Sequence, residues 1–318
     1  MITLDAVESY FPDTTVTVEE RAVQLGRGDV QAHMHRTVHG LDRMHYDAGL
    51  DLYDLVLPPA RRVLAGVDPE SVRYLLYGHA LHGARGVAPD TPQQIKRRLG
   101  LDRATAFAMT QQNCAIPLSA IDTAGALLRA DGDPGAKALV VTGEKPSAQV
   151  AEAIDTVMIA DGAASCLVSL DGPGAEVRSF ATRTRGEYYQ GLAGTREDFR
   201  SAAEMRPKVL WEIMREAVDR AGCTLDDIQW FIPPNQGYAF WDGTLDREPA
   251  AGKVFFANNG RFSHCLAADI LINAATLTEE RRFEPGRPSM FLATGLGWTF
   301  SAMVVVPSPL PSPLPEVR

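Results

Sequence analysis

Short apolar runs alternate with longer segments of helical spacing along most of the chain. In the first half the pattern predicts helices at residues 92–101 and 115–132, and strands at residues 73–80, 104–111, 137–144 and 165–170. Apolar runs of this length that end at glycine or polar residues are typical of buried strands, and an Ala/Leu-rich segment without a polar face is typical of a buried helix. Strands that alternate with helices predict an α/β fold with parallel strands covered by helices.

The pattern restarts after the Gly/Pro break DGPG at residues 171–174. It then predicts helices at residues 208–221 and 265–283, and strands at residues 176–185, 228–234, 253–259, 289–295 and 301–306. Because the two runs are comparable, we expect two equivalent halves, residues 1–170 and 171–306. The remaining residues, 307–318, are rich in proline, which cannot donate to a sheet, so we expect a loose tail.

Composition narrows the classes of partner. The chain has 318 residues and a net charge of −9, with a sequence pI of about 5.3, which argues against a broad nucleic-acid surface. No signal peptide and no apolar stretch long enough for a membrane span are visible. The four cysteines form no C-x-x-C pair, so we expect reduced thiols in a cytoplasmic protein.

Cys114 is the candidate nucleophile, in the segment TQQNCAIPLSA. It stands between a predicted strand and a predicted helix. A thiol at a helix N-terminus lies at the positive end of the helix dipole, and we expect this position to lower its pKa. The neighbouring backbone N–H groups could then hold a developing oxyanion. The alternative is a small cysteine buried in the core.

His264 is the candidate base, in NNGRFSHCLAADILIN. The alternative is a polar residue at the start of a helix. A metal site is a third possibility, because His33 and His35 form an H-x-H pair that a strand would present on one side, with four further histidines before residue 83. No ordered carboxylate partners accompany that pair, and the segment does not have the pattern of a buried strand.

Several segments together resemble the β-ketoacyl-acyl-carrier-protein synthase III family of the thiolase superfamily. They are ESYFPDTTVTVEE, QQIKRRLGLDRATAFAMTQQNCA, ALVVTGEK, IADGAASCLVSL and TGLGWTFSAMVVV. The resemblance covers residues 3–306 and places Cys114 at the family's nucleophile. It implies a duplicated five-layer αβαβα thiolase fold and a homodimer. It also implies that Gly295 and Gly297 belong to the turn that forms the oxyanion site with the backbone of Cys114.

Two departures from the family pattern bear on the chemistry. The family's catalytic histidine lies in V-P-H-Q-A-N, and the matching segment here places Pro234 at the histidine position. The family's catalytic asparagine lies in G-N-T-S-A-A-S, and ungapped alignment places His264 there. The resemblance therefore implies that His264 shares a pocket with Cys114. Asp269 could orient its imidazole, although a spacing of five is imperfect on a helix, and Asn235 could supply a hydrogen bond.

Because proline offers no donor for a thioester enolate, the resemblance points to acyl transfer rather than decarboxylative condensation. The expected enzyme resembles the synthase-III-like acyltransferases of secondary metabolism. It would move an acyl group from acyl-CoA or an acyl carrier protein to a small-molecule hydroxyl or amine, with no bound cofactor or metal. A decarboxylative condensing enzyme, with His264 and Asn235 in exchanged roles, is the first alternative, and a non-catalytic scaffold subunit is the second.

Overall fold

The computed structural model describes residues 1–81, 84, 86–154 and 157–308. Nine strands form one sheet: β1 Ile2–Tyr10, β4 Val72–Gly78, β5 Thr105–Met109, β6 Lys137–Gly143, β7 Ala163–Leu170, β8 Ala175–Thr184, β9 Phe231–Ile232, β10 Ser289–Gly295 and β11 Thr299–Val306. The short strands β2 Thr15–Thr17 and β3 Arg43–His45 form a separate pair.

The helices are α1 Val18–Gln24, α2 Asp29–His39, α3 Leu52–Val63, α4 Thr91–Leu99, α5 Ile116–Asp131, α6 Ala148–Ala153, α7 Arg196–Ala221, α8 Tyr238–Trp241, α9 Ala257–Phe262 and α10 Asp269–Glu279. Five single 3₁₀ turns accompany them: η1 Pro69–Ser71, η2 Asn113–Ala115, η3 Gly186–Tyr188, η4 Gly191–Ala193 and η5 Leu266–Ala268.

The large sheet has the strand order β5-β4-β6-β7-β1-β8-β11-β10-β9. It is mixed rather than parallel, which corrects the expectation from the sequence. Strand β4 pairs in parallel with β5 on one side and with β6 on the other. Helix α4 connects β4 to β5, and helix α5 connects β5 to β6. The hairpin from β10 to β11, and the pairs that β7 and β8 make with β1, are antiparallel.

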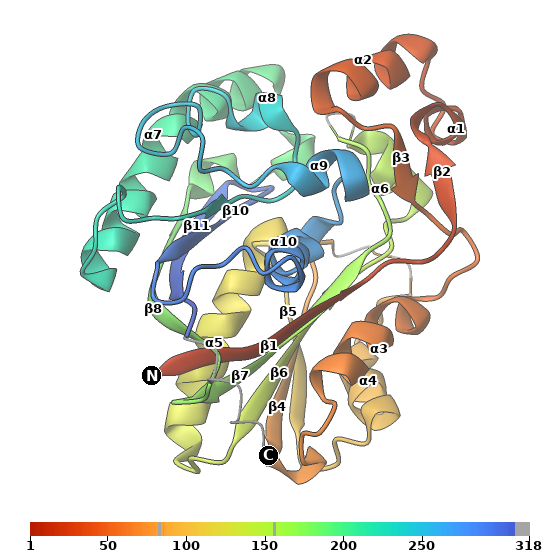
Figure 1. Cartoon of the computed structure of the whole chain (residues 1–318). Coiled ribbons are helices and arrows are strands. Elements are labelled where there is room, and N and C mark those ends of the chain that lie inside the picture. Colours follow the sequence, from red (N-terminus) through yellow and green to blue (C-terminus); the bar gives the residue numbers. More distant parts are fainter. Residues whose placement is uncertain (82–83, 85, 155–156, 309–318) are drawn as a thin grey trace, which may run out of the picture.

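The helices lie in three layers with the sheet between them (Figure 1). Along β4 and β6 the side chains alternate: Leu76 and Val140 join the central core with α5 and α10, whereas Leu75 and Val141 face α3 and α4. Along β10, Phe291 faces the central helices and its neighbour Leu292 faces α7. The order is therefore helix, sheet, helix, sheet, helix.

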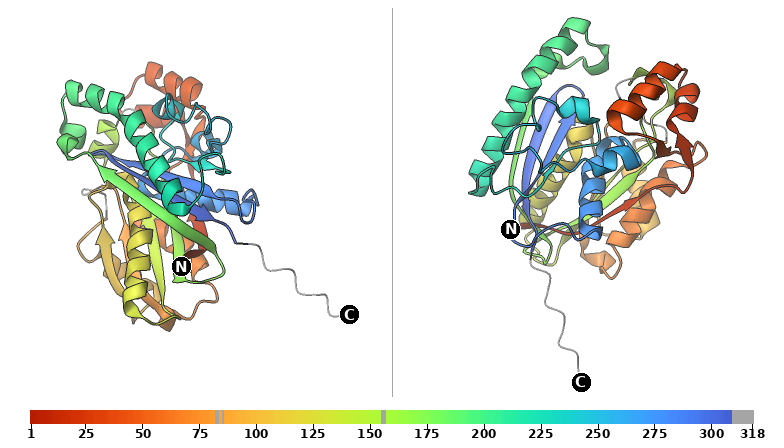
Figure 2. Two further views of the ribbon diagram at one scale, coloured as in Figure 1. Left: turned by 90° about the vertical axis from the view of Figure 1, so that its left-hand side faces the viewer. Right: turned by 45° about the horizontal axis from the view of Figure 1, so that its top comes forward.

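The right-hand view of Figure 2 shows α7 along one side of the sheet and α1 with α2 on the other side. Helix α7 begins at Arg196, twelve residues before the predicted helix at 208–221. Its true start is a capping box between Thr195 and Asp198, and the internal Pro207 led the sequence pattern to place the boundary too late.

Two strand predictions in the second half are wrong or too long. The strand predicted at 228–234 shrinks to β9, because Pro233 and Pro234 have no N–H to donate to a neighbour. In the segment predicted as a strand at 253–259, only Val254 makes an isolated bridge, and α9 follows from Ala257.

The predicted helix 265–283 begins instead as a 3₁₀ turn, and its α-helical part starts at Asp269.

Candidate active site

Cys114 lies in a sharp turn between β5 and α5. Gln111 and Asn113 adopt left-handed backbone conformations, with φ of 70° and 49°. Such a conformation costs roughly 1–2 kcal/mol for a non-glycine residue, and the cost is offset here by contacts such as the bond from Asn113 Nδ2 to the Leu296 carbonyl oxygen at 2.6 Å. The turn places the thiol at the N-terminal end of α5, as predicted, with 5% of the residue exposed.

His264 lies between α9 and η5, and its backbone is held by a neighbouring segment. Its N–H donates to the Met158 carbonyl oxygen at 3.3 Å, and its own carbonyl oxygen accepts from the Ala160 N–H at 3.0 Å. The residue before it, Ser263, has a φ of 60° and ends α9. This arrangement brings His264 Nε2 to 3.6 Å from Cys114 Sγ, so the structure places the two predicted residues together.

Asp269 contacts the other side of the imidazole. Its Oδ2 is 2.5 Å from His264 Nδ1 and accepts the Asn235 N–H at 2.7 Å, while its Oδ1 accepts the Cys265 N–H at 2.7 Å. The spacing of five works because η5, where Leu266 has a φ of 54°, replaces regular helix between the two residues. The carboxylate is fully buried at the first residue of α10, where the helix dipole favours a negative charge.

The electrostatics differ from the simple helix-dipole expectation. Burial raises the pKa of the Cys114 thiol, and the hydrogen bond and charge of His264 only partly oppose this. The expected lowering of its pKa is therefore wrong, because the loss of water around the sulfur outweighs the favourable groups. Burial by itself lowers the pKa of His264, but Asp269 and then Cys114 raise it to about 10. Because these contacts favour the imidazolium, the neutral imidazole that can accept a proton becomes more abundant as pH rises.

Glu144 is a buried acid that the sequence analysis missed. It directly follows β6, and its carboxylate accepts the N–H groups of Ala80 at 2.6 Å and Leu81 at 2.8 Å, together with that of Ala267 in η5. Burial raises the pKa of Glu144 to about 7, against the effect of these bonds and of the nearby His264. An acidic residue at the end of the apolar run KALVVTGE was the signal that could have found it.

Asn235 lies beside the dyad, one residue after Pro234. Its Oδ1 accepts a bond from Asn273 Nδ2 at 3.1 Å, and the same nitrogen donates to the Pro233 carbonyl oxygen at 2.8 Å. These bonds orient the carboxamide, and among the described residues none pairs with Asn235 Nδ2. Only the backbone N–H of Asn235, through Asp269, is linked to His264 in this structure.

The glycine turn between β10 and β11 packs against the segment before Cys114. A Cβ atom on Gly295 would lie 1.9 Å from the Gln112 carbonyl oxygen, so this close approach requires glycine. Gly297 has a φ of 84°. The structure thus brings Gly295 against the turn that carries the nucleophile.

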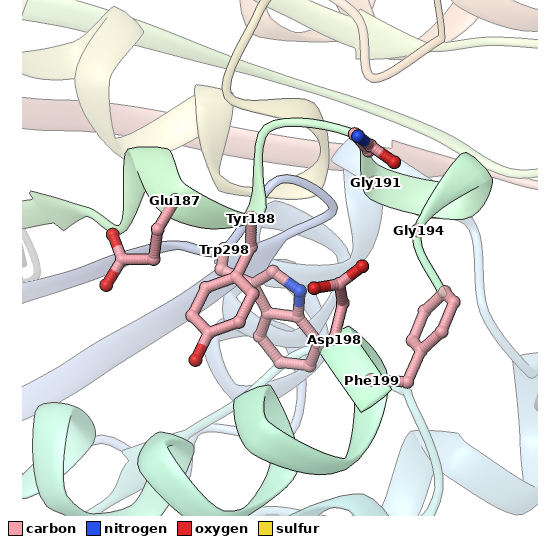
Figure 3. Close-up of a pocket in the computed structure, with 8 residues that line it drawn as sticks. Glu187, Tyr188, Gly191, Gly194, Asp198, Phe199 and Trp298 are labelled. Carbon is pink, nitrogen blue, oxygen red and sulfur yellow. The ribbon is translucent and has the colours of Figure 1, made fainter. Parts of the chain in front are cut away.

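A small pocket borders this turn at Trp298 (Figure 3). Its two carboxylates are already engaged. Glu187 pairs with Arg185 at 2.5 Å, and Asp198 accepts bonds from the N–H and hydroxyl of Thr195. Neither Cys114 nor His264 lines this pocket, so it is separate from the dyad.

The histidine-rich segment forms α2, not a strand. His33 is exposed and His35 is buried, so the H-x-H pair does not present two rings on one side. The four further histidines before residue 83 are His39, His45, His79 and His82, and His82 lies outside the described residues. Within the described part of the chain, no three His, Cys, Asp or Glu side chains are grouped to hold a metal ion.

Comparison with known proteins shows the fold and a similarity to one family of enzymes. Residues 218–306 match the family 3-oxoacyl-[acyl-carrier-protein (ACP)] synthase III C terminal. β-Ketoacyl-[acyl-carrier-protein] synthase III of Erythrobacter litoralis (strain HTCC2594) is 27% identical over 323 aligned positions, which cover 93% of this chain and 96% of that protein.

Two solved structures superpose over almost the whole chain. ChlB3, described as an acyltransferase, has a TM-score of 0.81 at 23% identity and covers 97% of this chain and 98% of its own. β-Ketoacyl-[acyl-carrier-protein] synthase III of Thermus thermophilus has a TM-score of 0.78 at 20% identity, with 96% and 98% covered.

The protein therefore has the thiolase fold, as predicted. The match over residues 218–306 and the similarity over most of the chain relate it to the β-ketoacyl-[acyl-carrier-protein] synthase III enzymes. Among the described residues, no helix combines the length and the apolar character needed to cross a membrane.

Proposed function

We propose that the protein is an acyltransferase that works through a covalent acyl group on Cys114. The observation that carries this proposal is the chain of contacts from Cys114 Sγ to His264 Nε2 at 3.6 Å and from His264 Nδ1 to Asp269 Oδ2 at 2.5 Å. A nucleophile, a base and a group that orients the base form the arrangement required for covalent acyl transfer.

In the first half-reaction, Cys114 attacks the carbonyl carbon of an acyl thioester, supplied by acyl-CoA or an acyl carrier protein. The neutral imidazole form of His264 takes the thiol proton at Nε2 as the sulfur–carbon bond forms. The tetrahedral intermediate places its negative oxygen near the N–H of Cys114 and the turn that contains Gly295 and Gly297. The bond to the donor's sulfur then breaks, and His264 returns the proton to the leaving thiolate.

In the second half-reaction, a hydroxyl or amine of the acceptor attacks the acyl carbon. His264 takes its proton and becomes an imidazolium, which the buried Asp269 carboxylate stabilises. The bond to Cys114 Sγ breaks, and the imidazolium protonates the released thiolate. The ester or amide leaves, and the enzyme returns to its starting protonation state.

The same geometry argues against an enolate-forming reaction. Pro234 offers neither a side-chain donor nor an N–H where the family has its histidine, and loss of one such donor typically costs about 10²–10³ in rate. His264 is also occupied on both ring nitrogens by Asp269 and Cys114. The proposal places the enzyme in secondary metabolism, and it agrees with the description of the similar structure ChlB3 as an acyltransferase.

A decarboxylative condensing enzyme is the second candidate. Asn235 Nδ2 is buried and has no partner among the described residues, which favours this candidate because such a donor could bind a thioester oxygen. Similar structures include a tetronic acid condensing enzyme, AbyA1, at 20% identity and a TM-score of 0.78.

In either case we propose a homodimer joined through the edge strand β5, because the resemblance implies a two-fold axis at the sheet and β5 ends the strand order.

Incubation with a panel of radiolabelled acyl-CoA and malonyl-CoA donors separates these candidates. Mass spectrometry locates the label on the protein, and an alkaline trap collects CO₂. A labelled Cys114 without CO₂ release supports the acyltransferase, whereas CO₂ release that depends on Cys114 overturns it in favour of condensation. If no donor from CoA or from an acyl carrier protein labels the protein, it is a scaffold subunit.

A further inference from the structure

The carboxylate of Glu144 lies near the dyad, but none of the reaction steps above uses it. Glu144 is buried and follows directly after β6. It accepts the N–H groups of Ala80 at 2.6 Å and Leu81 at 2.8 Å, which lie in the loop after β4, and it also accepts the N–H of Ala267 in η5. One carboxylate thus joins a loop from the first half of the chain to the turn that follows His264.

The two segments that Glu144 joins also surround the nucleophile. All three residues that donate to Glu144 belong to the same apolar cluster as Cys114. Turn η5 contacts η2, the turn that carries Cys114. Because η5 lies between His264 and the α-helical part of α10, a shift of η5 would change the distance of 3.6 Å between His264 Nε2 and Cys114 Sγ. The hydrogen bonds of Glu144 therefore hold one side of the dyad in place.

The next residue, Lys145, holds a second segment that borders the base. Its Nζ donates to Asp161 Oδ2 at 2.7 Å, and both side chains are buried. Asp161 directly follows Ala160, whose N–H donates to the His264 carbonyl oxygen at 3.0 Å. Two consecutive residues at the end of β6 are therefore linked to two different segments beside His264.

The charge of Glu144 destabilises the folded protein at neutral pH. Burial raises the pKa of Glu144 to about 7 against the effect of its three hydrogen bonds, so ionisation is less favourable in the folded chain than in the unfolded chain. A glutamine of the same shape would carry no such cost. Buried acids with pKa values shifted toward neutral pH are concentrated at functional sites.

The titratable groups that face Glu144 in the described chain are His264, the Cys114 thiol and the Tyr77 phenol, whose ring stacks on that of His79. Burial raises the pKa values of both the thiol and the phenol above their ordinary values, so neither is ionised at neutral pH. The pKa of His264 is raised to about 10, whereas that of Glu144 is raised to about 7. Kinetic measurements can therefore resolve the two ionisations.

We propose that Glu144 is a positioning residue for the acylation of Cys114: its carboxylate holds η5 against the loop after β4 and so keeps His264 within reach of the thiol. Protonation of Glu144 weakens its three bonds, because an N–H group binds a charged oxygen more strongly than a neutral one. The inference rests on the first half-reaction of the proposed function, which the acyltransferase and the condensing enzyme share.

The test measures single-turnover acylation of the full-length protein by acetyl-CoA, or by the donor in the panel above that labels Cys114 faster, at values from about pH 5.5 to about pH 9. Intact-protein mass spectrometry gives the rate. Acylation requires neutral His264 and, by this inference, charged Glu144. The logarithm of the wild-type rate should therefore rise with a slope of more than one, and up to about two, below pH 7, and of about one above it.

Glu144→Gln keeps the shape of the side chain but has one acceptor oxygen for three N–H groups, and it does not titrate. Its slope should be about one throughout. Because a small displacement of a catalytic group costs up to about 10²-fold in rate, we expect acylation roughly 10–100-fold slower than in the wild type near pH 9, and within about threefold of it near pH 5.5. Glu144→Asp retains the charge and should keep the steeper slope below pH 7 at a reduced rate. Glu152→Gln, an exposed change of the same kind on α6, is the matched control and should behave as the wild type.

Equal slopes in the wild type and Glu144→Gln would overturn the inference, while a labelled Cys114 would still support the proposed function. A variant slowed by the same factor at every pH would also overturn it, since the charge would then have no part in the effect. If Glu144→Gln does not fold by circular dichroism, the wild type and Glu144→Asp decide: a slope of one below pH 7 in both overturns the inference, and a steeper slope in both supports it. Absence of any acyl group on the wild-type protein refutes both proposals, because there is then no acylation for Glu144 to assist.

Discussion

Replacement of Asp269 by asparagine tests how the base is oriented. Asp269 is completely buried and accepts three bonds, from His264 Nδ1 and from the N–H groups of Asn235 and Cys265. Asparagine has one acceptor where the carboxylate has two. If its NH₂ group faces the imidazole, His264 must accept at Nδ1 and carry its proton on Nε2, where it cannot take another.

The magnitude follows from the tautomer of His264. The carboxylate, together with Cys114, raises the pKa of His264 from 6.5 to about 10 against the effect of burial. Loss of the carboxylate makes the neutral imidazole more abundant, but it leaves the proton on Nε2, which faces Cys114 and cannot accept another. Because this tautomer cannot act as the base, we expect Asp269→Asn to slow transfer by roughly 10³–10⁴-fold at neutral pH, as the equivalent change does in serine proteases.

The assay is single-turnover transfer from isolated acyl-enzyme, followed by intact-protein mass spectrometry at several pH values. Without the carboxylate the pKa of His264 falls, so the rising limb of the residual activity should move to lower pH. Asp226→Asn, an exposed change of the same kind, is the matched control and should have no effect. Transfer by Asp269→Asn within about threefold of the wild type, with the fold intact by circular dichroism, would refute the reasoning.

Four further outcomes follow from the same structure. His264→Ala should still acquire some acyl group but release it slowly, so acyl-enzyme accumulates during turnover; an unchanged acylated fraction would contradict this. Cys114→Ala should lose all activity. Alkylation of Cys114 by iodoacetamide should be slow at neutral pH and accelerate as pH rises, because burial raises the pKa of its thiol; Cys223, which is more exposed, should compete for the reagent. The folded-state pKa of Glu144 exceeds its unfolded value, so its contribution to stability is present at acid pH and lost as pH rises through about 7. Between pH 5 and 8 the wild type should lose about 2 kcal/mol more unfolding free energy than Glu144→Gln in urea titrations, and equal losses would show that Glu144 does not titrate there. Light scattering at micromolar concentration should give a dimer, and a monomer would count against the edge-strand interface.

Much of the fold could be predicted from local pattern. The apolar runs that became β4, β6, β7 and β10 are buried on both faces, and such strands give the clearest sequence signal. The pattern of apolar residues predicted the structure least well where contacts between distant segments determine the local backbone. The segment around Asn258 and Asn259 resembled a strand, but buried hydrogen bonds from these side chains hold α9 in place.

The residues of the candidate site could be predicted from the sequence, but the shifts in their pKa values could not. The resemblance to a known family suggested Cys114, His264 and Asp269, and the structure brings these three residues together. The 3₁₀ turn η5, which makes a spacing of five workable, depends on the packing of Leu266 in a left-handed conformation and has no clear sequence signal. The degree of burial, which raises the pKa of Cys114 and Glu144, likewise becomes visible only when distant segments are assembled.

The most direct test of the central claim is a pulse–chase experiment on Cys114 during turnover. The wild-type enzyme receives isotopically labelled acyl thioester, then an excess of unlabelled donor together with acceptor, and peptide mass spectrometry follows the label. We predict that the label appears on the Cys114 peptide, leaves it at the rate at which labelled ester or amide forms, and yields no CO₂. Product formation with no label on Cys114, or product formation accompanied by an equal amount of CO₂, would contradict the account.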